Sequence, residues 1–115
     1  MEKEIALDAL AALGQETRLD VFRLLVKVGP EGMTAGAISE KLEVRPNTLS
    51  THLGVLSRSG LVHASRDGRS IIYSARLPAM QDLVMYLLQD CCGGNPELCA
   101  PVFKTLSGPA SGPGG

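Results

Sequence analysis

Apolar residues recur along the first quarter of the chain at the spacing of amphipathic helices. One such segment covers 4–13 and a second covers 16–28, with Gly14 between them. We expect the second segment to direct one stripe of side chains toward the core: Leu19, Phe22, Leu25 and Val26. The pattern therefore predicts two consecutive helices at the start of the chain.

Two shorter helical patterns follow, separated by a break of a few residues. Thr34 is a suitable N-cap for the first, which continues to about Glu43, and Pro46 fits the first turn of the second, which ends near Arg58. The second should bury Leu49, Leu53 and Leu56. Two helices joined by three or four residues are typical of a helix-turn-helix.

After Gly60 the pattern changes to two β-rich runs, 61–66 and 69–75, with Asp67-Gly68 between them. Asp-Gly between two such runs predicts a β-hairpin. A last helix is expected over 78–91, with one apolar face made of Met80, Leu83, Val84, Leu87 and Leu88. The predicted fold class is mainly α with a β-hairpin wing, which is a winged helix-turn-helix.

The composition suits one small globular domain without a membrane span. The 115 residues are 44% hydrophobic, and no apolar run approaches the roughly 18 residues of a transmembrane helix. We assign residues 1–103 to the domain and the Gly/Pro/Ser-rich 104–115 to a flexible tail. The acidic N-terminus is unlike a signal peptide, so a cytoplasmic location is expected. The sequence contains no recognisable catalytic set, so we do not expect an enzyme.

Positive charge is concentrated in one part of the chain although the net charge is −1. Residues 44–76 contain one acid, Asp67, and five arginines, whereas acids are in excess on both sides of that segment. Such a distribution favours a focused phosphate-binding face, although scattered surface arginines remain an alternative.

The second helix of the helix-turn-helix carries short polar side chains that fit a DNA major groove. The arginines before it, at its end and beside the hairpin tip could reach phosphates or a minor groove. His52 is either a DNA contact or a packing histidine. The predicted DNA-binding residues are Arg45, Asn47, Thr48, Ser50, Thr51, His52, Arg58, Arg66 and Arg69.

A single module of this kind makes few phosphate contacts, so we expect a homodimer across a pseudo-palindromic site in double-stranded operator DNA. The first and last helices are the best candidates for the interface, because the last has an apolar face wider than one core contact requires. The residues predicted to form it are Ile5, Leu83, Val84 and Leu87.

These segments closely resemble the ArsR/SmtB family of metal-responsive repressors over about residues 5–100. The resemblance is carried by ALAALGQETRLDVFRLLV at 9–26, MTAGAISEKLEVRPNTLSTHLGVLSRSGLV at 33–62 and RDGRSIIYSA at 66–75. It implies a dimeric repressor of a resistance operon that an inducer displaces from its operator.

The resemblance does not define the inducer, because members of the family place ligands on different elements. The first helix of the helix-turn-helix lacks the cysteines of a common arsenic site, and the last helix lacks the histidines of a zinc site. No cysteine precedes Cys91, as a cadmium or lead site would need. The remaining candidate for an inducer site is the segment CCGGNPELC at 91–99. It resembles the site of those arsenic-responsive family members whose cysteines lie at and beyond the end of the last helix.

The predicted ligands in this inducer-binding loop, residues 91–99, are Cys91, Cys92 and Cys99. Arsenite exchanges three hydroxides for three thiols and forms a neutral pyramidal centre, whereas structural zinc usually requires four ligands. We therefore expect As(III) as inducer, and Sb(III) similarly. Open alternatives are a thiol redox switch, a soft divalent metal such as cadmium or lead, incidental cysteines, and an arsenic-buffering protein without specific DNA binding.

Overall fold

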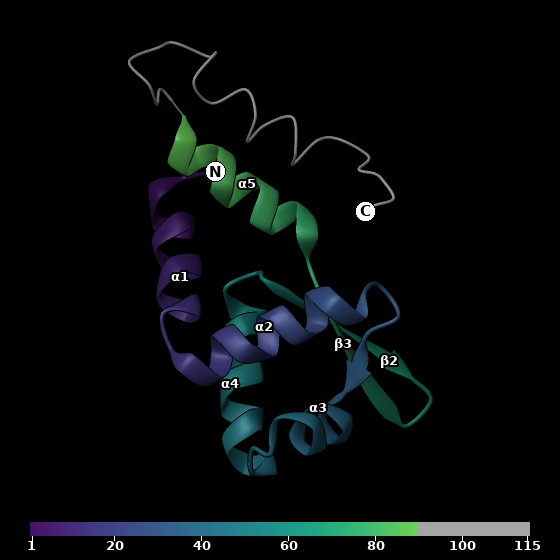
Figure 1. The fold of residues 1–115 in the computed structure, drawn as a ribbon. Helices are drawn as coiled ribbons and strands as arrows, with labels where there is room; N and C mark the ends of the chain where they lie inside the picture. Colours follow the sequence, from purple (N-terminus) through teal and green to yellow (C-terminus); the bar gives the residue numbers. More distant parts are fainter. Residues whose placement is uncertain (90–115) are drawn as a thin grey trace.

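The computed structural model describes residues 1–89, which form five helices and a three-stranded sheet (Figure 1). Helices α1 and α5 lie at one end of the molecule and α3 at the other (Figure 1). In chain order the elements are α1 (Lys3–Leu13), α2 (Glu16–Val28), β1 (Met33–Thr34), α3 (Ala35–Leu42), α4 (Pro46–Arg58), β2 (Val62–Asp67), β3 (Ser70–Ala75) and α5 (Leu77–Leu88). Within these residues, no helix is long and apolar enough to cross a bilayer.

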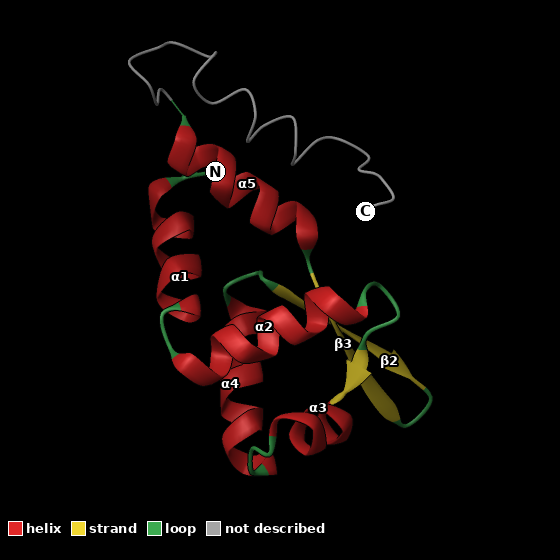
Figure 2. Cartoon of the chain, in the orientation of Figure 1, coloured by secondary structure: helices red, strands yellow, loops and turns green. Residues whose placement is uncertain are grey.

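This order confirms the winged helix-turn-helix prediction. The strands gather at one side of the molecule, with the hairpin β2–β3 projecting beyond the helices (Figure 2). The sheet has the order β1-β3-β2, and all its pairs are antiparallel. The short strand β1 was not predicted, because two residues are too few to produce an alternating pattern.

The hairpin turn lies one residue later than expected. Asp67 pairs with Ser70 at the end of the ladder, so the loop consists of Gly68 and Arg69. Gly68 has φ of 65°, which suits the first central position of a two-residue hairpin turn. Asp67 therefore belongs to β2, and Arg69 occupies the tip of the wing.

The turn between α3 and α4 is held by local hydrogen bonds. Thr34 caps α3 as predicted, since its hydroxyl oxygen accepts the N–H of Ala37 at 3.1 Å. At the other end Glu43 adopts a left-handed conformation with φ of 56°. Two bonds between Ser39 and Val44 complete the turn. The Ser39 hydroxyl donates to the Val44 carbonyl, and the Val44 N–H donates to the Ser39 carbonyl.

The core is mainly aliphatic, with Phe22 as its one aromatic member among the buried residues, and all five helices and the hairpin contribute to it. As predicted, α4 contributes Leu49, Leu53 and Leu56, all buried. From α1, by contrast, the small side chains are the buried ones: Ala6, Ala9 and Ala12. A face of alanines lets α1 approach its neighbours closely and leaves its larger apolar side chains outside.

Two predictions about inward-facing residues are wrong. On α2 the buried side chains are Val21, Phe22 and Leu25, whereas Leu19 and Val26 are 42% and 41% exposed. Apolar residues occur on more than one side of this helix, so periodicity alone did not select the correct face.

Helix α5 ends at Leu88, three residues before the expected position.

Candidate nucleic-acid interface

Helix α4 separates its apolar and polar side chains cleanly. Pro46 occupies the first turn and Arg45 the N-cap position, because proline at that place loses no helical hydrogen bond. The three buried leucines hold the helix on the core. The predicted contact residues lie exposed on it: Asn47, Thr48, Ser50 and Thr51.

Two of these side chains are already ordered by bonds to the helix itself. The Asn47 side-chain oxygen accepts the N–H of Thr48 at 2.9 Å, and the Thr51 hydroxyl donates to the Asn47 carbonyl at 3.3 Å. The Asn47 amide nitrogen has two donor hydrogens for an external acceptor. The first turn of α4 thus presents polar groups with restricted rotamers.

His52 differs from its neighbours because it is only half exposed and is tied to another helix. Its Nδ1 lies 3.2 Å from Nη1 of Arg18 on α2. A guanidinium only donates, so Nδ1 is the acceptor and the ring proton of neutral His52 is on Nε2. Arg18 was not predicted as a site residue, and its partner is 34 positions away.

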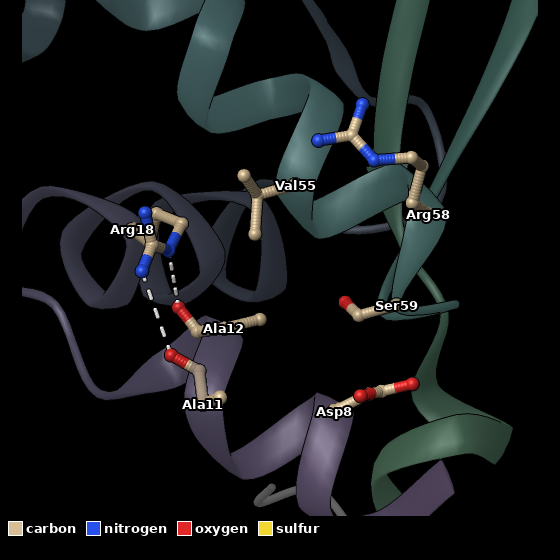
Figure 3. Close-up of a pocket in the computed structure, with 7 residues that line it drawn as sticks. All are labelled: Asp8, Ala11, Ala12, Arg18, Val55, Arg58 and Ser59. Atoms are coloured by element: carbon tan, nitrogen blue, oxygen red, sulfur yellow. Dashed lines mark hydrogen bonds between the residues drawn. The ribbon is translucent and has the colours of Figure 1, made fainter.

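The four predicted phosphate-binding arginines are all exposed and are distributed around α4 and the hairpin. Arg45 precedes α4, Arg66 lies on β2 opposite Ile71, and Arg69 is in the hairpin turn. Arg58 ends α4 next to a hollow of about 320 Å³ formed by α1, α2 and α4 (Figure 3). Residues that line it include Asp8, Ala12, Arg18 and Ser59.

The predicted interface residues fall into two groups. Ile5 and Leu87 are 49% and 52% exposed, and Val84 is half-buried. Leu83, by contrast, is 2% exposed and belongs to the same buried cluster as the alanines of α1. Leu83 thus contributes to the core of the single chain, which differs from its predicted place at a subunit interface.

Several further large apolar side chains are exposed on α1, α2 and α5. On α1 they are Leu7 and Leu10, on α2 Leu19 and Val26, and on α5 Leu77 and Met85, all at least 40% exposed. A groove of about 740 Å³ lies between α2 and α5, lined mainly by apolar side chains such as Phe22 and Met80, and also by Arg23 and Lys27. The exposed large apolar residues of α1, α2 and α5, including Ile5 and Leu87, and this groove are together called the apolar face.

The predicted inducer ligands Cys91, Cys92 and Cys99 lie outside the described residues, as does the tail 104–115. Within residues 1–89, no three His, Cys, Asp or Glu side chains gather into a group that could hold a metal ion. In sequence, Cys91 comes three residues after the end of α5 at Leu88.

The fold and the polar face of α4 define a winged helix-turn-helix protein of the DNA-binding class. Residues 13–63 match a helix-turn-helix domain family, HTH_20. A solved ArsR-like transcriptional regulator from Rhodococcus sp. RHA1 has the same fold, with a TM-score of 0.68 and 24% identity over 90% of this chain and 93% of that chain.

Curated relatives place the chain in a family. The transcriptional repressor SdpR of Bacillus subtilis is 31% identical over 87 residues, which cover 76% of this chain and 93% of SdpR. The nodulation protein NolR of Rhizobium meliloti is 35% identical over 79 residues, which cover 69% of this chain but 62% of NolR. The chain belongs to the ArsR/SmtB family of helix-turn-helix transcriptional regulators.

Proposed function

We propose that this protein is a homodimeric repressor that binds operator DNA and releases it when Cys91, Cys92 and Cys99 bind arsenite. The observation that carries the proposal is the separation of surfaces on one small domain. The exposed polar side chains of α4 and the arginines of the hairpin are on different elements from the exposed large apolar side chains of α1, α2 and α5. Helix α5 is followed within three residues by the first cysteine.

The DNA-binding part of the proposal rests on the exposed side chains of α4 and the wing. Asn47, Ser50 and Thr51 can donate to base edges in a major groove while Arg45 binds a phosphate. Arg69 at the wing tip reaches the neighbouring backbone or minor groove. The buried leucines of α4 hold it on the core, so its orientation is defined before DNA arrives.

The dimer rests on the apolar face. Monomeric proteins rarely expose contiguous apolar patches of this kind without a partner. Leu7, Met85 and Leu87 are each more than half exposed, and α5 also lines, with α2, a groove made mainly of apolar side chains. A second copy of the chain covers this face and places two recognition helices on successive turns of the duplex.

The sensor rests on the chemistry of the cysteine cluster. Three thiols match the three covalent bonds of As(III), whose lone pair occupies the fourth position. The six residues GGNPEL between Cys92 and Cys99 include two glycines and a proline, a composition that allows the chain to turn, so all three thiols can come from one chain. One subunit therefore supplies a full ligand set, with one arsenic atom for each chain. Antimonite has the same valence and binds in the same way.

The connection between α5 and the wing offers a route from sensor to DNA. One residue, Arg76, separates β3 from α5. Its N–H donates to the Leu61 carbonyl at 2.8 Å, and its carbonyl accepts the N–H of Ala79 at 3.1 Å in the first turn of α5. A displacement of α5 on arsenite binding is therefore passed to the hairpin through a short and well-bonded link.

The proposal is tested by operator binding with a panel of inducers. Operator duplexes are selected from a random pool by the purified protein, and affinity is measured by fluorescence anisotropy against a scrambled duplex. We expect dimer binding to the selected duplex, and arsenite or antimonite to weaken it by about 5–150-fold, the usual size of allosteric coupling.

The other panel members distinguish the alternatives. Release by cadmium or lead but not arsenite would assign a divalent-metal sensor, and release by peroxide alone would assign a thiol redox switch. Equal affinity for selected and scrambled DNA, with tight arsenite binding, would assign an arsenic buffer. Any of these three results overturns the proposal.

A further inference from the structure

A single side chain, that of Arg18 on α2, joins two helices that do not follow one another in the chain, α1 and α4. Figure 3 shows its bonds to the carbonyls of Ala11 and Ala12 on α1. Its Nε donates to the Ala12 carbonyl at 2.6 Å, and its Nη2 lies 3.5 Å from the Ala11 carbonyl. Its Nη1 donates to Nδ1 of His52 on α4 at 3.2 Å. One guanidinium therefore bonds both the last turn of α1 and the middle of the predicted recognition helix.

Both halves of this arrangement have a clear physical basis. The last carbonyls of a helix lack intrahelical partners and carry partial negative charge, so a cation at the C-terminal end of α1 is favourable. The fork of Arg18 reaches two of these carbonyls and still has a nitrogen free for His52. Gln15 caps the helix that carries Arg18, because its side-chain oxygen accepts the backbone N–H of Arg18 at 2.9 Å.

The bond to Arg18 also selects the tautomer of the neutral His52 ring. Because Nδ1 accepts from Arg18, the neutral ring carries its proton on Nε2, where it is a donor. His52 is the one predicted DNA-binding residue that is half-buried, and the bond to Arg18 restricts the orientation of its ring. A contact made by Nε2 to DNA would then have both its direction and its donor character defined in advance.

We propose that Arg18 is a positioning residue for DNA recognition: it fixes His52 on α4 to the end of α1, so that the base-reading geometry of α4 depends on the position of α1. The inference rests on the DNA-binding part of the proposed function and needs no inducer. Arg18 acts through His52 and does not itself bind a phosphate.

The test is a double-mutant cycle on operator affinity with Arg18→Gln and His52→Gln. Glutamine at 52 can place its amide N–H near the position of Nε2, but it has no acceptor atom at the position of Nδ1, where Arg18 donates. We expect each single variant to lose roughly tenfold in affinity for the selected operator. The double variant should be no weaker than either single one, since both remove the same link. Affinity for scrambled DNA should stay unchanged.

Lys3→Gln is the matched control, because it removes one positive charge from an exposed residue of α1. It should leave operator affinity as in the wild type. Additive losses in the double variant would overturn the inference. An equal loss on scrambled DNA after Arg18→Gln would overturn it too, because that result assigns a direct phosphate contact. Absence of operator binding by the wild type would instead overturn the proposed function.

A measurement without DNA keeps the inference testable if an Arg18 variant folds poorly or if no operator is found. In ¹⁵N spectra of the free protein, the ring nitrogens of His52 should shift after Arg18→Lys, which keeps the charge but cannot serve all three acceptors. Lys3→Gln should leave them in place. Unchanged His52 resonances in folded Arg18→Lys protein would contradict the link.

Discussion

The Ser39 hydroxyl on α3 donates a hydrogen bond to the carbonyl of Val44, on the far side of the helix-turn-helix turn. This carbonyl lies beyond the end of α3 and before the start of α4, where no helical hydrogen bond serves it. Together with the bond from the Val44 N–H to the Ser39 carbonyl, it holds the turn between α3 and the recognition helix α4.

Ser39→Ala removes this bond and should destabilise the domain by about 1 kcal/mol, the usual net value of one hydrogen bond in a half-buried place. Urea unfolding measures the loss. Ser50→Ala is the control, because Ser50 is exposed on α4 and alanine there favours the helix. Equal stability of the Ser39 and Ser50 variants would show that the turn does not depend on the Ser39 hydroxyl.

Gly32 precedes β1 where the backbone passes close to β3. It has φ of 69°, and a Cβ added to it would lie 2.5 Å from the Tyr73 carbonyl oxygen and 2.8 Å from Cγ2 of Ile72. Gly32→Ala should therefore cost at least about 2 kcal/mol of unfolding free energy, from strain and displacement of β1.

Gly29→Ala is the comparison for that measurement, since Gly29 also has positive φ but a Cβ added there would meet no atom within 4 Å. Its φ of 94° and ψ of −166° are adopted almost only by glycine, so alanine there should cost about 1–3 kcal/mol from backbone strain alone, and less than Gly32→Ala, which adds the clash with β3. Similar losses in the two thermal or urea unfolding curves would argue against the close approach of Gly32 to β3.

A charge on the apolar face should separate the proposed dimer. Leu87→Glu places a carboxylate at a side chain that is 52% exposed in the single chain, so folding of the subunit should survive while association fails. Analytical ultracentrifugation should report a monomer and anisotropy a large loss of operator affinity. Ile71→Glu is the control, since Ile71 is 41% exposed on β3, away from this face, and should leave a dimer. A dimeric Leu87→Glu protein would contradict the proposed interface.

The wing tip should contribute to affinity through phosphate charge. Arg69→Ala should weaken binding to selected and scrambled duplexes alike and should reduce the slope of log K against log salt by about 1 for each subunit. Ser50→Ala should instead lower affinity for the selected duplex alone. An unchanged salt slope after Arg69→Ala would place the wing tip away from the DNA backbone.

Most of the fold could be predicted because local signals agree with the tertiary structure. Thr34 is a good cap and forms one, Pro46 starts a helix, and the leucines of α4 repeat at one spacing with polar residues between them. Where helix capping and periodicity point the same way, the sequence alone is sufficient.

The features that the sequence did not predict depend on distance in the chain or on competing faces. Leu19 is wrongly predicted to be buried because its helix has apolar residues on several sides, and packing against α1 and α4 selects Val21 instead. The link from Arg18 to His52 joins residues 34 positions apart, and neither residue type indicates the other. Only the arrangement of three helices brings them together.

Our central claim is that arsenite binding by three thiols of one subunit lowers the affinity of the protein for operator DNA. Operator release by arsenite in cysteine variants tests it most directly. Anisotropy of a labelled operator duplex is followed during arsenite titration for the wild type, for each single Cys→Ser variant at 91, 92 and 99, and for the triple variant. We expect all proteins to bind the operator without arsenite, and only the wild type to release it, with one arsenic atom bound per chain. Release of the operator from the triple-serine protein at the same arsenite concentration would contradict the account.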